Sequence, residues 1–73
     1  MISKREFREL KKGDVLVDVN GYWLVVDDYD DYHDTVCMGE CDVNEDTGEW
    51  ELLDGFYNPY TTYVDVHKCE KCN

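Results

Sequence analysis

One long acidic stretch without any basic side chain constrains this chain more than any other feature of its sequence. From Gly13 to His67 there is no lysine or arginine, whereas fifteen aspartates and glutamates fall in the same stretch. Because an unpaired buried charge is strongly unfavourable, these carboxylates must face water. The chain therefore has to fold from short elements that have one apolar face and one wet face.

The few basic residues are concentrated at the ends of the chain, and the net charge is −11. The basic residues are Lys4, Arg5, Arg8, Lys11, Lys12, Lys68 and Lys71. A field of this sign repels nucleic acid and anionic membranes and attracts basic partners. We therefore expect a basic protein partner, with no direct binding to nucleic acid or membrane. A solubilising role for the acids stays open as the alternative, although solubility needs a net charge of only about 2 to 8.

The size of the chain predicts a single domain over residues 1–73, because so short a chain has only one small core to build. The opening segment is charged from Lys4 onward and has no apolar run typical of an export signal or a membrane span. We therefore expect a cytoplasmic protein in a reducing compartment, where disulfides are rare.

The first residues carry a complete helix start signal. Ser3 and Glu6 fit a capping box, and Ile2 and Phe7 fit the flanking hydrophobic staple. Gly13 falls where a left-handed cap would end the helix. These signals predict a short helix over residues 4–11.

A hairpin is predicted next, because Asn20 and Gly21 separate two runs rich in β-branched and aromatic residues. A two-residue turn would pair Val19 with Tyr22, Val17 with Leu24 and Val15 with Val26.

The rest of the chain predicts three further strands. Residues 27–34 are too charged to be buried, and residues 35–38 read as the third strand. A second turn over residues 44–48 leads to a fourth strand over 49–53. After a loop over 54–60, residues 62–67 read as the last strand, with Val64 and Val66 inward.

These elements predict a mainly β fold. We expect a five-stranded small barrel, or a strongly curled antiparallel sheet, with a body over residues 14–67 and a tail over 68–73. Tyr22, Trp50 and Phe56 are expected in the core, which is the usual place of large aromatic residues. The segment from Phe7 to Val17, followed by the tight hairpin, resembles the opening of many small SH3-like barrels. The resemblance covers about residues 7–26 and implies a fold rather than an activity.

The cysteines form two closely spaced pairs, Cys37 with Cys41 and Cys69 with Cys72. Two such pairs could supply a tetrahedral structural zinc site, provided that the chain bends at Gly39. Free thiols are the other interpretation and the one we favour, so we expect no cofactor, with one structural zinc ion as the alternative. A disulfide or redox pair stays open as a third possibility.

No catalytic motif is present, and carboxylates are so abundant that their proximity cannot identify a general acid and base. We therefore expect no enzymatic activity. Tyrosines that lie among acids or in loops suit an interface with an arginine-rich surface. The residues expected to contact a partner are Asp27, Asp28, Tyr29, Asp30, Asp31, Tyr32, Asp34, Glu49, Glu51, Tyr57 and Tyr60.

Together these features predict a non-enzymatic acidic domain that binds the basic groove of a DNA- or RNA-binding host protein. In size and charge the chain resembles the small acidic inhibitors of bacteriophage, which act as DNA mimics. The alternative is a zinc-stabilised accessory domain of a larger assembly, in which Cys37, Cys41, Cys69 and Cys72 hold the metal.

Overall fold

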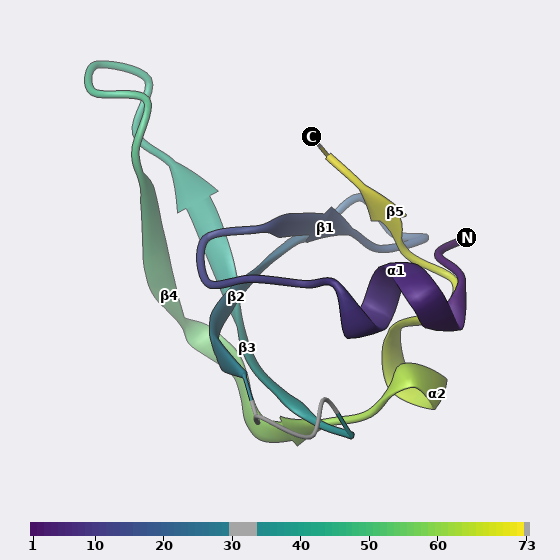
Figure 1. The fold of residues 1–73 in the computed structure, drawn as a ribbon. Helices are drawn as coiled ribbons and strands as arrows, with labels where there is room; N and C mark the ends of the chain where they lie inside the picture. Colours follow the sequence, from purple (N-terminus) through teal and green to yellow (C-terminus); the bar gives the residue numbers. More distant parts are fainter. Residues whose placement is uncertain (30–33, 73) are drawn as a thin grey trace.

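The computed structural model describes residues 1–29 and 34–72, so Asp30, Asp31 and Tyr32 of the predicted binding set lie outside the described residues. Two short helices and five strands follow one another along the chain (Figure 1). They are α1 (Lys4–Arg8), β1 (Val15–Val17), β2 (Trp23–Tyr29), β3 (Val36–Val43), β4 (Trp50–Thr61), α2 (Tyr63–Val66) and β5 (Glu70–Lys71). The prediction of a mainly β domain with a short N-terminal helix is confirmed.

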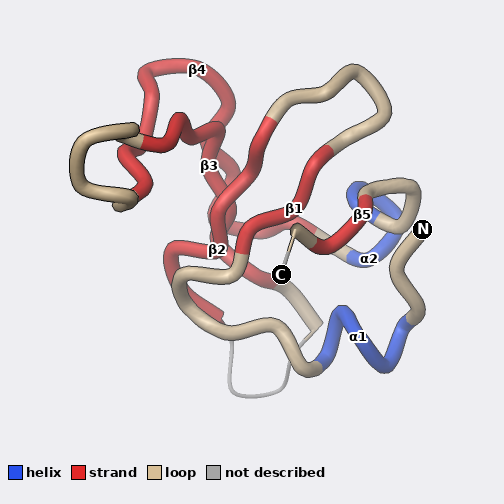
Figure 2. Tube along the Cα trace, turned by 90° about the horizontal axis from the view of Figure 1, so that it is seen from above, coloured by secondary structure: helices blue, strands red, loops and turns tan. Residues whose placement is uncertain are grey.

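All strand pairs are antiparallel, and the strand order in the sheet is β4-β3-β2-β1-β5. The sheet curls around the core but does not close, since the described residues of its two edge strands, β4 and β5, do not pair with each other. Figure 2 shows the curl from above, with both helices on the side of β5. Of the two predicted architectures, the curled open sheet is therefore the one that is present.

The first hairpin has a register one residue away from the predicted one. Val15 pairs with Val25, Leu16 with Leu24, and Val17 with Trp23. Asp18 explains the shift, because its Oδ1 accepts hydrogen bonds from the backbone N–H groups of Asn20 and Tyr22 at 2.8 and 3.0 Å. The loop then has three residues and ends on Gly21, at a φ of 86°. This is the geometry of a type I turn followed by a left-handed bulge residue.

The register shift decides which side chains enter the core. Leu16 and Leu24 are buried together, whereas the predicted partners Val19 and Tyr22 are 74% and 56% exposed. The core cluster consists of Ile2, Phe7, Leu10, Leu16, Leu24, Val26, Val36, Met38, Val66 and Cys69. Phe56, also expected in the core, is 44% exposed, while Trp50 is half-buried.

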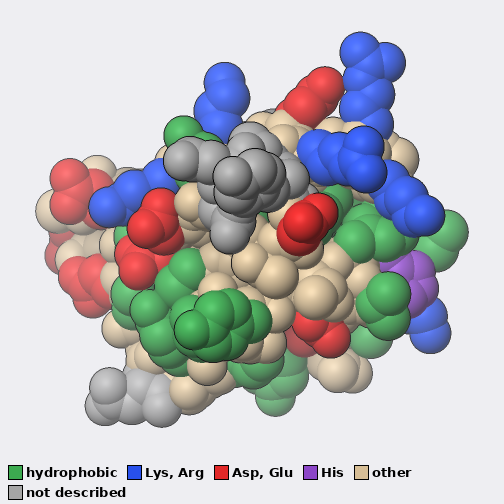
Figure 3. All heavy atoms as spheres, turned by 60° about the horizontal axis from the view of Figure 1, so that its bottom comes forward, with side chains coloured by type: hydrophobic (Ala, Val, Ile, Leu, Met, Phe, Trp, Pro, Cys, Tyr) green, Lys and Arg blue, Asp and Glu red, His purple; other side chains and the backbone are tan. Residues whose placement is uncertain are grey.

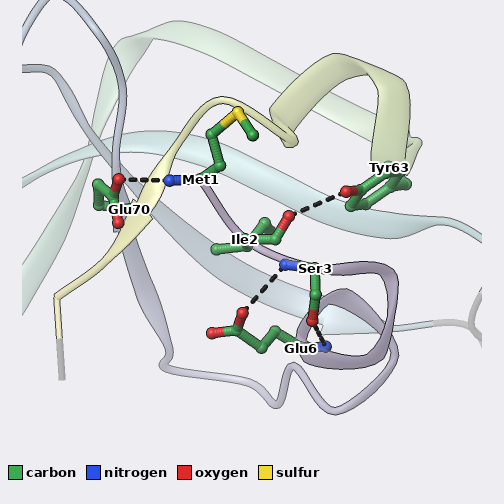
Figure 4. Close-up of polar contacts among 6 residues, drawn as sticks. All are labelled: Met1, Ile2, Ser3, Glu6, Tyr63 and Glu70. Carbon is green, nitrogen blue, oxygen red and sulfur yellow. Dashed lines mark hydrogen bonds and ion pairs between the residues drawn. The ribbon is translucent and has the colours of Figure 1, made fainter.

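The N-terminal helix has the predicted start but is shorter than predicted, because α1 ends at Arg8 rather than at residue 11. The Ser3 hydroxyl accepts a hydrogen bond from the Glu6 N–H at 3.1 Å, and the Glu6 carboxylate accepts one from the Ser3 N–H at 3.0 Å. Tyr63 in α2 donates its hydroxyl hydrogen to the Ile2 carbonyl at 2.9 Å, and the Met1 ammonium pairs with Glu70 (Figure 4). The start of the chain is thereby attached to its last elements.

The prediction of a final strand over residues 62–67 is wrong, since residues 63–66 form the helix α2. The Asp65 carboxylate accepts hydrogen bonds from the Thr62 N–H at 2.8 Å and from the Thr62 hydroxyl at 3.0 Å, which favours a helix start at Thr62. Val66 is buried as predicted, but Val64 is 74% exposed because a helix does not alternate its faces. The fifth strand is the short β5, within the segment expected to be a tail.

The predicted second turn is confirmed, and the fourth strand is longer than predicted. Gly48 has a φ of 73°, and the Asn44 N–H donates to the Glu49 carbonyl at 2.8 Å. β4 includes the segment 54–60 that was expected to be a loop. Cys41 pairs with Leu52 and Gly39 with Tyr57, so residues 53–56 bulge out of the ladder. As an edge strand, β4 can accommodate Pro59, which cannot donate to a ladder.

Candidate functional site: a tyrosine–aspartate hollow

A surface hollow of about 350 Å³ lies across the ends of three neighbouring strands, away from the turn of the β3–β4 hairpin. It is lined by Asp27, Asp28, Tyr29, Thr35, Cys37, Tyr57, Pro59 and Tyr60. We call it the tyrosine–aspartate hollow. Five of its eight lining residues belong to the set that the sequence predicted for partner binding, so the fold brings together residues that are thirty positions apart.

The two aspartates share the hollow because β2 is irregular at this point. Val26 pairs with Met38, but the next pair is Asp28 with Cys37, so Asp27 is the extra residue of a bulge. In a regular strand, adjacent side chains point to opposite faces, whereas a bulge sets two residues opposite one on the partner strand. The bulge therefore lets both carboxylates line one hollow. The Asp28 Oδ1 also accepts a hydrogen bond from the Tyr29 N–H at 2.8 Å, which fixes its position.

Tyr57 is held in the hollow by a cysteine. The Cys37 thiol donates a hydrogen bond to the Tyr57 Oη at 3.0 Å, which leaves the phenolic hydrogen able to donate elsewhere. The neighbouring Cys37 sulfur is the largest cause of a pKa of Tyr57 above its usual value of 10.0, because an ionised sulfur accepts the phenolic hydrogen and repels a phenolate, and the negative charges of Asp27 and Asp28 add to it. Tyr57 is therefore a neutral hydrogen-bond donor at physiological pH.

The hollow offers aromatic surface and negative charge to solvent. Tyr57 is 57% and Tyr60 is 74% exposed. Among the described residues, no lysine or arginine lines the hollow. In the part of the chain that the structure describes, the acids that form ion pairs are Glu9, Asp14 and Glu70, and none of them lies near the hollow in sequence. Figure 3 shows one face of the molecule, with hydrophobic side chains at the lower left and at the right, carboxylates between and beside them, and most of the visible Lys and Arg side chains in the upper half of the view.

The other described residues of the predicted set lie elsewhere. Glu49 and Glu51 are exposed at the β3–β4 hairpin, where the Asn44 side-chain amide donates to Glu51 at 3.4 Å. Asp34 is exposed and lines a different depression, together with Lys4, Phe7, Arg8 and Tyr63. Thr35 and Pro59 were not among the predicted site residues, and Cys37 was expected to be a free thiol or a zinc ligand, because no local pattern reveals which residues a bulge and an edge strand will bring together.

The four cysteines differ in burial. Cys41 and Cys69 are buried, Cys37 is half-buried and Cys72 is exposed, and all four are free thiols. Burial is the main cause of a raised pKa at both Cys41 and Cys69. Among residues 1–29 and 34–72, no three histidine, cysteine, aspartate or glutamate side chains are placed to hold a metal ion together.

None of the helices in the described segments is both long and apolar enough to cross a membrane. Comparison of the chain with protein-family models, with curated proteins and with solved structures gave no match.

Proposed function

We propose that this protein is a non-enzymatic binding domain that places the tyrosine–aspartate hollow on a basic surface of a partner protein. The observation that carries the proposal is the convergence of Asp27, Asp28, Tyr57 and Tyr60 around one hollow, whose described lining residues include no lysine or arginine. The curled β fold is compatible with an SH3-like domain, but the binding role is inferred from the hollow, because a fold of this kind does not by itself imply a function.

The chemistry of the hollow suits arginine in particular. Two adjacent carboxylates can accept hydrogen bonds from a guanidinium group, and the exposed tyrosine rings can stack on its plane. Lysine offers a point charge without that planar fork, so it would gain less from the rings. The neutral phenol of Tyr57 can further donate a hydrogen bond to a backbone carbonyl of the partner.

The partner that we propose is a nucleic-acid-binding protein, because its basic groove offers arginines spaced to meet phosphates. The aspartates at the hollow and the exposed acids of the β3–β4 hairpin would then take the place of phosphate charges. Among the exposed acids of the hairpin, the ones that would do so are Asp42, Glu49 and Glu51. This arrangement would block the groove for its own ligand, as a DNA mimic does.

The test measures binding of a fluorescent arginine-rich peptide by anisotropy, beside a peptide in which glutamine replaces arginine. Asp27→Asn with Asp28→Asn should weaken binding about tenfold, since each lost charge-assisted hydrogen bond contributes about 1.5 to 3 kcal/mol before solvent screening. The matched control is Glu45→Gln with Asp46→Asn, which removes the same charge at the hairpin turn.

We expect the control variant to bind the arginine-rich peptide within about twofold of the unchanged protein. We also expect the affinity of the unchanged protein for this peptide to fall as the salt concentration rises. If both double variants lose the same affinity for the peptide, the interaction is a non-specific attraction by net charge and the proposed site is wrong. A partner captured from cell extract should be released by double-stranded DNA or RNA; retention of the partner under that competition would contradict the mimic.

A further inference from the structure

A second hollow, of about 360 Å³, lies on the core side of the curled sheet, between the bulge in β4 and the α2 end of the molecule. It is lined by Asp18, Tyr22, Leu24, Glu40, Phe56, Asn58, Asp65, Val66 and Cys69. We call it the seam groove, because the sheet stays open between its two edge strands. Its volume falls within the range of about 300 to 1,000 Å³ of small-molecule sites.

Three carboxylates from three different elements line the seam groove, and each is held by a backbone donor. Asp18 accepts from two N–H groups of its own turn, Asp65 from the Thr62 N–H, and Glu40 from the Phe56 N–H at 3.4 Å. In each case these bonds use one oxygen, and the other oxygen has no hydrogen-bond partner among the described residues. The charges are therefore positioned before any ligand arrives.

The floor of the seam groove is apolar. Leu24, Val66 and Cys69 are buried members of the core cluster that also line the groove. Tyr22 and Phe56 add two aromatic rings, which are 56% and 44% exposed. The groove thus combines a surface for methylene groups with rings that attract organic cations.

The arrangement of the carboxylates indicates what kind of cation fits. Asp18, Glu40 and Asp65 line the same groove, yet they are not placed to hold one metal ion together. A compact ion needs convergent oxygens, whereas separate carboxylates around an apolar floor suit several positive charges joined by methylene spacers. None of the three takes part in the ion pairs found in the described segments.

We propose that the seam groove binds a linear aliphatic polyamine, with its ammonium groups at the three carboxylates and its methylene groups over Leu24, Val66 and Cys69. The site is separate from the tyrosine–aspartate hollow, and binding there does not depend on the proposed function. The described residues that line the groove include no lysine or arginine, so none of them repels a cationic ligand.

The experiment titrates the protein with spermidine by calorimetry and maps the site by NMR. Chemical shifts should change at the backbone amides of Leu24, Val66 and Cys69. Glu40→Gln and Asp65→Asn each keep an oxygen acceptor for the backbone N–H, and each should weaken spermidine binding about fivefold. The matched controls are Glu45→Gln and Asp46→Asn at the hairpin turn, which should change the affinity less than about twofold.

Two further measurements distinguish spermidine binding in the seam groove from spermidine binding elsewhere on the protein. Magnesium chloride at equal ionic strength should not displace spermidine, because it has no methylene groups to place on the apolar floor. Asp27→Asn with Asp28→Asn should leave spermidine binding unchanged, so that failure of the hollow and failure of the groove are distinguishable.

The polyamine assignment is overturned if the hairpin controls weaken binding as much as the groove variants do, or if magnesium displaces spermidine. It is also overturned if a tetralysine peptide shifts the groove amides while spermidine does not, since the groove would then take side chains of a protein. Absence of shifts at all three floor residues contradicts the site itself.

Discussion

The capping box of α1 couples one carboxylate to the start of the helix. The Glu6 carboxylate accepts the Ser3 N–H, and this hydrogen bond is the largest cause of a pKa of Glu6 below its ordinary value of 4.5. A lowered pKa in the folded state means that the ionised form stabilises the fold. That contribution is fully present above pH 4.5 and is lost as the pH falls through the folded pKa of Glu6.

We therefore expect Glu6→Gln to lower stability at pH 7 but to change it little at a pH below the folded pKa of Glu6. Glutamine can still accept the Ser3 N–H but carries no charge. Urea unfolding followed by circular dichroism across this pH range measures the difference between the two proteins. Ser3→Ala is the comparison, because it removes the hydroxyl cap at every pH and should cost about 1 kcal/mol throughout. If the loss of stability caused by Glu6→Gln is the same at every pH, the charge of Glu6 does not stabilise the fold.

The thiols should differ in reactivity according to their burial. Cys72 is exposed and should react first with a disulfide reagent, followed by the half-buried Cys37. Cys41 and Cys69 are buried and have raised pKa values, so little thiolate is present to react. When the reaction with the reagent is followed by absorbance at pH 8, Cys41 and Cys69 should react only as the protein unfolds. Cys72→Ser should abolish the fastest phase of the reaction with the disulfide reagent. If all four thiols react fast in the folded protein, Cys41 and Cys69 are not buried.

At the scale of elements, the three-residue loop of the first hairpin depends on Gly21. Its φ of 86° disfavours side chains, and a Cβ there would meet no atom within 4 Å. Gly21→Ala should therefore destabilise the protein through backbone strain alone, by about 1 to 2 kcal/mol. Gly21→Asn should cost less than half as much, because asparagine tolerates this conformation. Chemical unfolding measures both values, and equal costs for the two variants would argue against a left-handed Gly21.

The same hairpin shows how far the sequence predicts the fold. The Asn-Gly pair located the turn correctly, but the register depends on the side chain of Asp18, which competes for the turn's backbone donors. Similarly, Val64 and Val66 alternate like a strand, while Thr62 and Asp65 together favour a helix start. Two valid local signals were in conflict at each place, and the one supported by the side-chain hydrogen bonds of Asp18 or Asp65 prevailed.

The candidate site was predicted in its residue types but not in its geometry. Aspartates beside tyrosines indicated an interface, and Asp27, Tyr57 and Tyr60 do line one hollow. Their convergence depends on the bulge in β2 and on the pairing of Gly39 with Tyr57, for which the sequence carries no separate signal. The seam groove was missed because Tyr22 and Phe56 were expected in the core.

At the scale of the whole molecule, like charges repel one another and destabilise the compact state. We expect the thermal unfolding midpoint to rise as sodium chloride is increased from about 0.01 to 1 M, because the Debye length falls from about 30 to about 3 Å. Glu45→Gln with Asp46→Asn should reduce this dependence on salt. Scanning calorimetry measures it, with tetramethylammonium chloride as a control for specific binding of sodium. A midpoint that falls with added salt would mean that attractive ion pairs outweigh the repulsion.

The two ends of the fold also differ in charge. α1 carries Lys4, Arg5 and Arg8 near one end of a molecule 34 Å long, and the turn of the β3–β4 hairpin projects at the opposite side (Figure 1). That turn exposes Glu45, Asp46 and Glu49. The molecule is therefore an electric dipole as well as a net anion. A positively charged surface exerts a torque on it during approach, so the protein rotates its acidic hairpin turn toward that surface before contact.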